Sequence, residues 1–239
     1  MKKLVITLFV CGMAYNSLAQ SKEIAPGDSI PWELRKQSFI YNTAKSFNDE
    51  IVARMAIYNL LAESPGNGAL YDSLAISYLQ YNQNVSAALA AQQALRINPN
   101  DMFAVEIAAT GFDKVGAKDK SLNNYEKLFL DNQDINVLYR IAFLQYELKR
   151  FAESNASLDI IIGDPAAKER TISFPTADRQ GQDVSLEVAA YRVKAMIEET
   201  NGNIDVAKQK YLEVLEMKPG FQIVQQQLRE LTQSKEGGE

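Results

Sequence analysis

The sequence predicts an all-α fold built from repeated pairs of helices. Residues 69–100 place apolar and small side chains at helical spacing, and a similar pattern recurs on both sides. Pro65 and Pro99 occupy equivalent places in two successive copies of this pattern, which gives a period of about 34 residues. Periods of this length are typical of solenoids, in which each unit buries its apolar face against its neighbours. We therefore expect a continuous ribbon-like core.

The unit at 69–100 also carries a recognisable motif. Its residues at the motif positions are Tyr71, Leu74, Ala75, Tyr78, Ala87, Ala91, Ala94 and Pro99. This pattern resembles the tetratricopeptide repeat (TPR), with Tyr71 in place of the first Trp of that family. The resemblance implies a right-handed α-solenoid of helix-turn-helix pairs, with a concave groove lined by the first helix of each pair.

The resemblance covers five units within one domain at 33–233. The predicted parts are a lead-in at 20–32, units at about 34–67, 68–101, 102–134, 135–167 and 188–221, a capping helix at 221–233 and a disordered tail at 234–239. The fourth unit allows two registers that differ by a single position. We prefer the shifted register, because it places Ala142 rather than Phe143 where the paired helices approach closely.

An insertion at 168–187 interrupts the period. The interval from Pro99 to Pro219 is longer than three repeats, and the surplus falls in this segment. Within it, apolar residues alternate at Ile172 and Phe174 and again at Val184 and Leu186, on either side of a polar, Gly-containing stretch. This alternation favours a small inserted β-hairpin, with an irregular loop as the alternative. We expect the hairpin to protrude and to be dispensable for folding but not for function, because insertions into repeats often belong to the binding face.

Residues 1–19 have the three parts of a secretory signal peptide. Two lysines precede an apolar run from Leu4 to Ala14, and Ser17-Leu18-Ala19 places small residues before a cleavage point at Gln20. The run is too short to span a bilayer. A buried N-terminal helix is one alternative. A lipoprotein signal is another, although no small residue precedes Cys11.

Cleavage before Gln20 would leave a mature chain without cysteine or histidine. The whole chain has 25 basic and 30 acidic residues, and cleavage would remove two lysines, so the net charge of the mature chain would be −7. An acidic chain argues against nucleic acid as a partner, because phosphate binding needs a basic face. No other apolar run approaches membrane-spanning length. We therefore expect an exported, periplasmic protein, with outer-membrane association through a partner as a further option.

Catalysis has few candidate groups in this sequence. The mature chain would lack the usual nucleophile–base pairs and zinc-thiolate ligands. The pair Glu198-Glu199 cannot act as acid and base, because adjacent helical residues diverge by about 100 degrees. The run from Asp131 to Asp134 lacks the ligand spacing of a calcium loop. We expect no enzyme activity, cofactor or metal.

The resemblance assigns groove positions to the first helix of each unit. The resulting candidates for binding a protein or peptide are Arg35, Asn42, Asp72, Leu79, Phe103, Glu106, Tyr139, Phe143, Tyr146 and Arg192. Tyr139, Phe143 and Tyr146 form an i, i+4, i+7 stripe, which belongs to the groove in the shifted register and to the core otherwise. The acidic members favour a basic or neutral ligand.

The function expected from these features is that of a non-catalytic scaffold or adaptor in the bacterial cell envelope. It would bind a protein or peptide segment in the groove. Two alternatives remain: a periplasmic holdase chaperone, and a structural module that assembles with its own copies through the solenoid ends or the hairpin.

Overall fold

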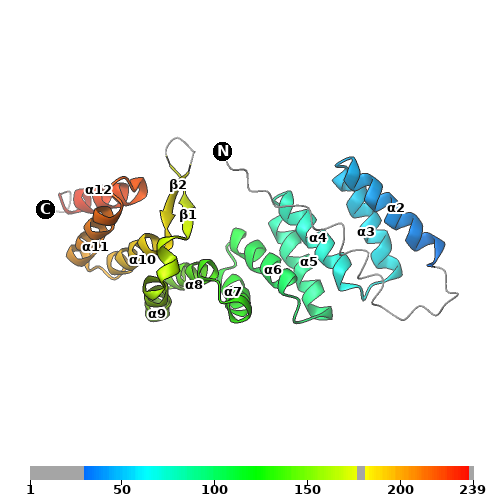
Figure 1. Ribbon diagram of the computed structural model, residues 1–239, viewed down its shortest axis with the longest axis horizontal. Helices are drawn as coiled ribbons and strands as arrows, with labels where there is room; N and C mark the ends of the chain where they lie inside the picture. The colour runs from blue at the N-terminus through cyan, green and yellow to red at the C-terminus, as the bar shows by residue number, and fades with distance from the viewer. Residues whose placement is uncertain (1–29, 177–180, 237–239) are drawn as a thin grey trace. The chain divides into compact units, whose positions relative to one another are not determined.

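The computed structural model describes residues 30–176 and 181–236, which fold into consecutive helices and one hairpin (Figure 1). The signal peptide and most of the lead-in predicted above lie outside these residues. The chain forms two compact units, Met1–Val115 and Gly116–Glu239. The boundary divides the third predicted repeat between its two helices. The single continuous domain stays a prediction, and each unit is described by itself.

The first unit contains five described helices that pack in sequence order. They are α2 (Trp32–Ser46), α3 (Glu50–Glu63), α4 (Gly68–Gln80), α5 (Asn84–Ile97) and α6 (Met102–Lys114). Side chains cap two of them, since Asp49 and Asp101 accept hydrogen bonds from the first turns of α3 and α6. These two helices therefore begin where the local sequence supplies a cap.

Small residues allow the helices of the first unit to approach one another closely. Ala53, Ala75, Ala87 and Ala91 are completely buried. At Gly111 of α6, an added Cβ atom would lie 3.1 Å from both the Cβ and the backbone nitrogen of Ala88 on α5. Small side chains are thus buried along these helices, and Gly111 marks a close approach of α6 to α5, the second helix of the preceding repeat.

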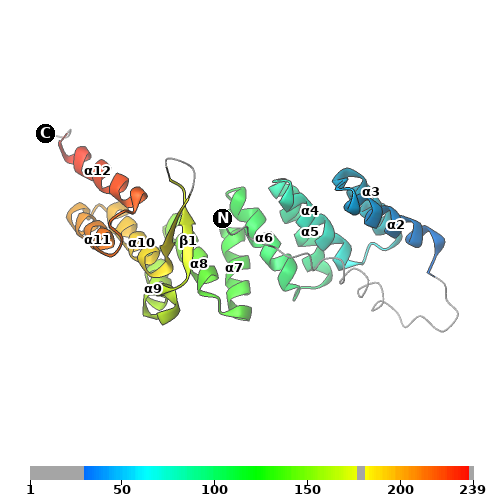
Figure 2. The same cartoon turned by 45° about the horizontal axis from the view of Figure 1, so that its top comes forward.

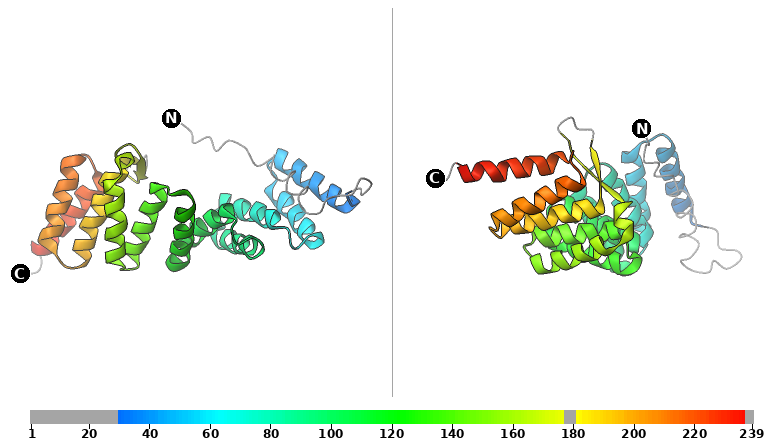
Figure 3. Two further views of the ribbon diagram at one scale, coloured as in Figure 1. Left: turned by 60° about the horizontal axis from the view of Figure 1, so that its bottom comes forward. Right: turned by 60° about the vertical axis from the view of Figure 1, so that its left-hand side comes forward.

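The second unit contains six described α-helices and the hairpin. In order they are α7 (Lys118–Asn132), α8 (Ile135–Glu147), α9 (Phe151–Gly163), the 3-10 turn η1 (Pro165–Lys168), β1 (Thr171–Phe174), β2 (Gln182–Ser185), α10 (Leu186–Thr200), α11 (Ile204–Met217) and α12 (Gln222–Glu236). The helices of this unit stand side by side (Figure 3). Because α12 continues to Glu236, residues 234–236 are helical and were wrongly assigned to a disordered tail. Lys235 and Glu236 are good helix formers, which favours the extension.

The turns inside the repeats show the register directly. Asn48, Asn82 and Gly116 have positive φ angles and follow one another at the repeat period. In the fourth repeat, the residue with a positive φ angle between the two helices is Lys149, which is one position short of that period. Leu138, Ile141 and Ala142, which the shifted register points inward, are all buried. The fourth repeat therefore follows the shifted register.

The insertion forms a two-stranded antiparallel hairpin beside α10 (Figures 1 and 2). Ile172 pairs with Val184, and Phe174 pairs with Gln182. Phe174 and Val184 are buried within the main hydrophobic core of the second unit. The predicted hairpin is confirmed. Because its apolar face is part of the core, we expect it to contribute to folding, contrary to the prediction that it is dispensable.

Candidate functional site

The predicted binding residues of the first unit keep access to solvent. Arg35 and Asn42 on α2 and Phe103 and Glu106 on α6 are exposed. Asp72 and Leu79 on α4 are half-buried. We call these six residues the first-unit face. The structure places them on α2, α4 and α6, which are the first helices of three successive repeats. Of these three helices, α4 and α6 are in contact.

Asp72 lies beside a second carboxyl group, that of Asp101 at the start of α6. Asp101 accepts a hydrogen bond from the backbone N–H of Ala104 at 3.2 Å. The Oδ1 atom of Asp72 is buried and has no hydrogen-bond partner among the residues that the structure describes. Burial, and then the nearby charge of Asp101, raise the pKa of Asp72 to about 7. A cation close to this carboxyl group would favour its ionised form.

Asp101 is not among the binding residues predicted from the sequence. An Asp immediately before an apolar helical run is an N-cap signal, which places its carboxylate at a defined helix end. What the sequence could not show is that α4 brings Asp72 to this helix end.

The raised pKa predicts how the stability of the first unit depends on pH. The pKa of Asp72 is about 7 in the native state, above its ordinary value of 3.8. At pH values between 3.8 and about 7, the native state therefore holds a proton that the unfolded chain has released. The resulting stabilisation is complete below about pH 4 and is lost as the pH rises through about 7. Asp72→Asn should therefore raise the free energy of unfolding at pH 8 by about 1 to 2 kcal/mol, allowing for the partial exposure of the group, and should change it less at pH 5.

Urea denaturation at both pH values measures this difference. Glu63→Gln, at an exposed position at the end of α3, is the matched control and should alter stability little at either pH. Equal effects of Asp72→Asn at pH 5 and pH 8 would contradict the assignment.

The predicted binding residues of the second unit have a different environment. Tyr139 on α8 and Arg192 on α10 are only 4% and 6% exposed. Phe143 and Tyr146 are partly buried and pack against the same core. Their rings lie 5.9 Å apart, and Tyr146 also contacts Phe151 of α9 at 6.1 Å.

Two segments of the chain itself cover Arg192. Its guanidinium lies 5.3 Å from the centre of the Phe174 ring, which comes from the hairpin. Its Nε donates a hydrogen bond to Oε1 of Gln227 on α12 at 2.9 Å. Its charge also interacts with the hydroxyl group of Tyr139, and burial raises the pKa of that tyrosine to about 12. Arg192 is thus enclosed by side chains from α8, the hairpin and α12.

The prediction that Tyr139 and Arg192 present an open surface is therefore wrong. Both belong to the first helices of their repeats, as predicted, and they contact each other there. The hairpin and α12 occupy the space above them, since Phe174 packs edge-on against Phe221 with ring centres 5.0 Å apart. Gln182 further ties the hairpin to the start of α12 through hydrogen bonds with Gly220 and Gln222.

No group of three or more metal-binding side chains occurs within residues 30–176 and 181–236 as described. Among the helices of these same ranges, none combines the length and apolar character that a membrane span requires.

Successive antiparallel helix pairs with small residues at the pair contacts define the fold of the tetratricopeptide-repeat proteins. The comparison with solved structures agrees. A tetratricopeptide repeat protein from Parabacteroides merdae ATCC 43184 matches with a TM-score of 0.60 at 17% identity, over 84% of this chain and 73% of that one. YrrB, described as a TPR protein with an unusual peptide-binding site, matches with a TM-score of 0.62 at 12% identity, over 79% and 88% of the two chains.

A third similar structure is residues 41 to the end of MamA from Desulfovibrio magneticus RS-1. It matches with a TM-score of 0.56 at 10% identity, over 81% of this chain and 99% of that one. No family model and no curated protein matches the sequence. At these identities the similarity establishes the fold.

Proposed function

We propose that this chain is a non-catalytic scaffold or adaptor that binds a protein or peptide segment on the first-unit face. The main observation in support is that the predicted binding residues differ in exposure between the two units. In the second unit the chain covers Tyr139 and Arg192, whereas in the first unit Arg35, Asn42, Phe103 and Glu106 are exposed and the carboxyl group of Asp72 is half-buried. The occurrence of a peptide-binding site on the same fold in YrrB supports a role of this kind.

The chemistry of the first-unit face favours a segment with a cationic side chain. Asp72, Asp101 and Glu106 supply negative charge, and a bound Lys or Arg would form a charge-assisted interaction with the half-buried Asp72 carboxylate. Phe103 and Leu79 supply apolar area for the neighbouring residues of the segment. Binding should therefore strengthen as the pH rises through about 7 and Asp72 ionises.

Selection from a random peptide library tests this function. The chain from Gln20 onward should enrich peptides with Lys or Arg, and Asp72→Asn combined with Glu106→Gln should reduce their affinity at least tenfold. Glu63→Gln combined with Glu213→Gln removes two exposed acidic side chains elsewhere and should not weaken binding. Failure to enrich any peptide, or equal binding by both double variants, would reject the proposal.

A location in the periplasm is part of the same proposal and rests on the predicted signal peptide. Protein recovered from the envelope fraction should begin at Gln20 when its N-terminus is sequenced. Retention of Met1 would refute this location.

A further inference from the structure

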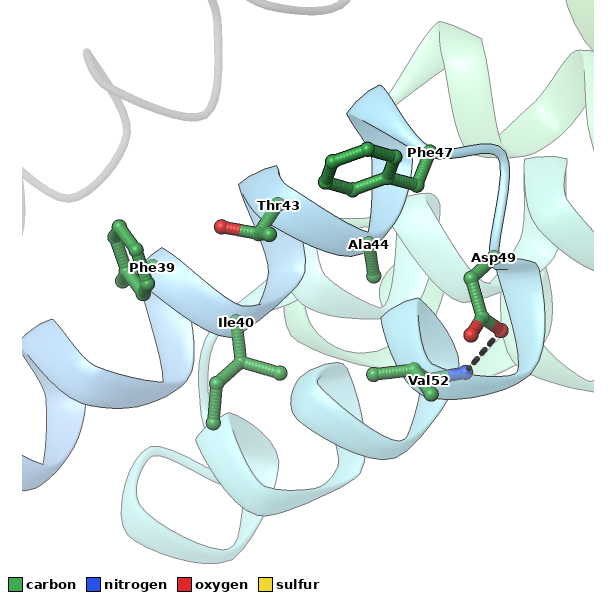
Figure 4. Close-up of a pocket in the computed structure, with 7 residues that line it drawn as sticks. All are labelled: Phe39, Ile40, Thr43, Ala44, Phe47, Asp49 and Val52. Atoms are coloured by element: carbon green, nitrogen blue, oxygen red, sulfur yellow. Dashed lines mark hydrogen bonds between the residues drawn. The ribbon is translucent and has the colours of Figure 1, made fainter.

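The first repeat exposes a large apolar surface at the start of the first unit. Phe39 and Phe47 are 71% and 80% exposed. They border an open depression of about 370 Å³ between α2 and α3, whose floor includes Ile40, Ala44 and Val52 (Figure 4). Figure 4 shows the two rings on either side of Thr43, along one side of α2. We call Phe39, Ile40, Thr43, Ala44, Phe47 and Val52 the end face.

The repeat itself shows what normally covers this position. Phe39 and Thr43 correspond to Ile107 and Gly111 of α6, which lie two repeat periods further along the chain. Ile107 is only 3% exposed, and Gly111 lies against α5, the second helix of the preceding repeat. In the interior of the unit, a helix therefore packs where the end face is open, and in the first repeat no described helix precedes α2.

We propose that the end face is the interface of a symmetric dimer, in which two copies pack through their α2–α3 ends. The surface carries both projecting rings and an adjacent hollow. A two-fold axis places the same patch of both copies in contact, so the Phe39 and Phe47 rings of each copy can enter the depression of the other. This proposal does not rest on the proposed peptide-binding function.

The available area suits an interface of ordinary size. The exposed large apolar side chains of α2 and α3 include Trp32, Phe39, Phe47, Ile51, Val52 and Met55, which are 36% to 80% exposed. If each contributes of the order of 100 Å², one copy offers roughly 600 Å², close to the roughly 800 Å² per partner of stable complexes.

Charge does not oppose this association. Lys36 is paired with Glu33, and Lys45 forms an ion pair with the buried Glu50 at 2.8 Å. Lys36 and Lys45 are thus neutralised within each copy, so that these two side chains add little like-charge repulsion when two identical surfaces approach.

A second copy fits this surface better than the other available occupants. The outer positions of the last helix, α12, are polar, including exposed Gln222, Gln226, Arg229 and Glu230, so a head-to-tail contact would place apolar side chains on a polar helix. The sequence at 20–29, QSKEIAPGDS, supplies few apolar side chains with which to cover two phenylalanines. The apolar run from Leu4 to Ala14 is expected to be removed with the signal peptide.

Sedimentation velocity of the chain from Gln20 onward tests the interface. The apparent mass should double between low and high micromolar concentration. Phe39→Asp combined with Phe47→Asp places four carboxylates in the dimer interface, so this variant should sediment as a monomer throughout. Because both rings are exposed, its circular dichroism and Tm should match those of the unsubstituted chain, which separates lost association from lost folding.

Leu130→Asp combined with Leu212→Asp is the matched control, since these residues are 76% and 46% exposed on α7 and α11. This variant should still dimerise. A monomeric unsubstituted chain, or a dimer that persists in the Phe39→Asp and Phe47→Asp variant, would overturn the proposal. A chain that dimerises only after residues 20–29 are deleted would assign the end face to that segment and would also overturn it.

Discussion

Phe174→Ala is expected to lower the free energy of unfolding of the second unit by about 3 to 5 kcal/mol, the range found when a buried aromatic ring is removed. The ring is 9% exposed, packs against Phe221 and covers the Arg192 guanidinium. Its loss would leave a cavity and would also expose one side of a buried charge. The hairpin is therefore expected to contribute to the stability of the unit, contrary to the prediction from the sequence.

Guanidinium denaturation followed by circular dichroism measures this loss. Ser173→Ala changes the adjacent strand residue, which is exposed, and should alter stability by less than about 0.5 kcal/mol. A change below about 1 kcal/mol for Phe174→Ala would mean that the hairpin detaches without consequence and that the protruding loop was the better description.

Tyr139→Ser should destabilise the same unit by a similar amount, about 3 to 5 kcal/mol. The tyrosine is 4% exposed within the main core, and its hydroxyl group interacts with Arg192. Serine would remove the ring and leave the guanidinium without one of its buried partners. If Tyr139 instead lined an open groove, the same substitution would cost little, because little buried area would be lost.

Thermal and chemical denaturation distinguish these outcomes. Leu130→Ser on α7, where the side chain is 76% exposed, should leave the transition nearly unchanged. Combining Tyr139→Ser with Phe143→Ser and Tyr146→Ser is expected to unfold the second unit, since the summed loss approaches the whole stability of a typical domain. A triple variant with an unchanged melting curve would restore the groove assignment.

The two units differ in how much of the predicted binding surface they leave accessible. In the second unit, Phe174 and Gln227 contact Arg192 and take positions that a ligand would otherwise use. In the first unit, Asp72 retains a buried oxygen without a partner among the described residues, and Phe103 and Glu106 remain exposed. The proposed ligand surface is therefore the first-unit face, whose residues lie on α2, α4 and α6.

The sequence by itself determined the parts of this protein that depend on local pattern. The repeat period located the helix pairs, and the alternation at Ile172, Phe174 and Val184 located the hairpin. Ala142, chosen because close helix packing needs a small residue, is completely buried. Helical and strand periods depend on neighbouring residues along the chain, so a single sequence is sufficient to detect them.

Only the tertiary structure decided which predicted surface residues are accessible. Arg192 is enclosed by Gln227 from the last helix and by Phe174 from the insertion. Asp72 meets Asp101 only because α4 packs beside the start of α6. The repeat period assigns a residue to one side of its own helix, whereas its exposure depends on segments that lie outside the period, such as the hairpin and α12. Their docking arises from long-range packing, which the local pattern does not encode.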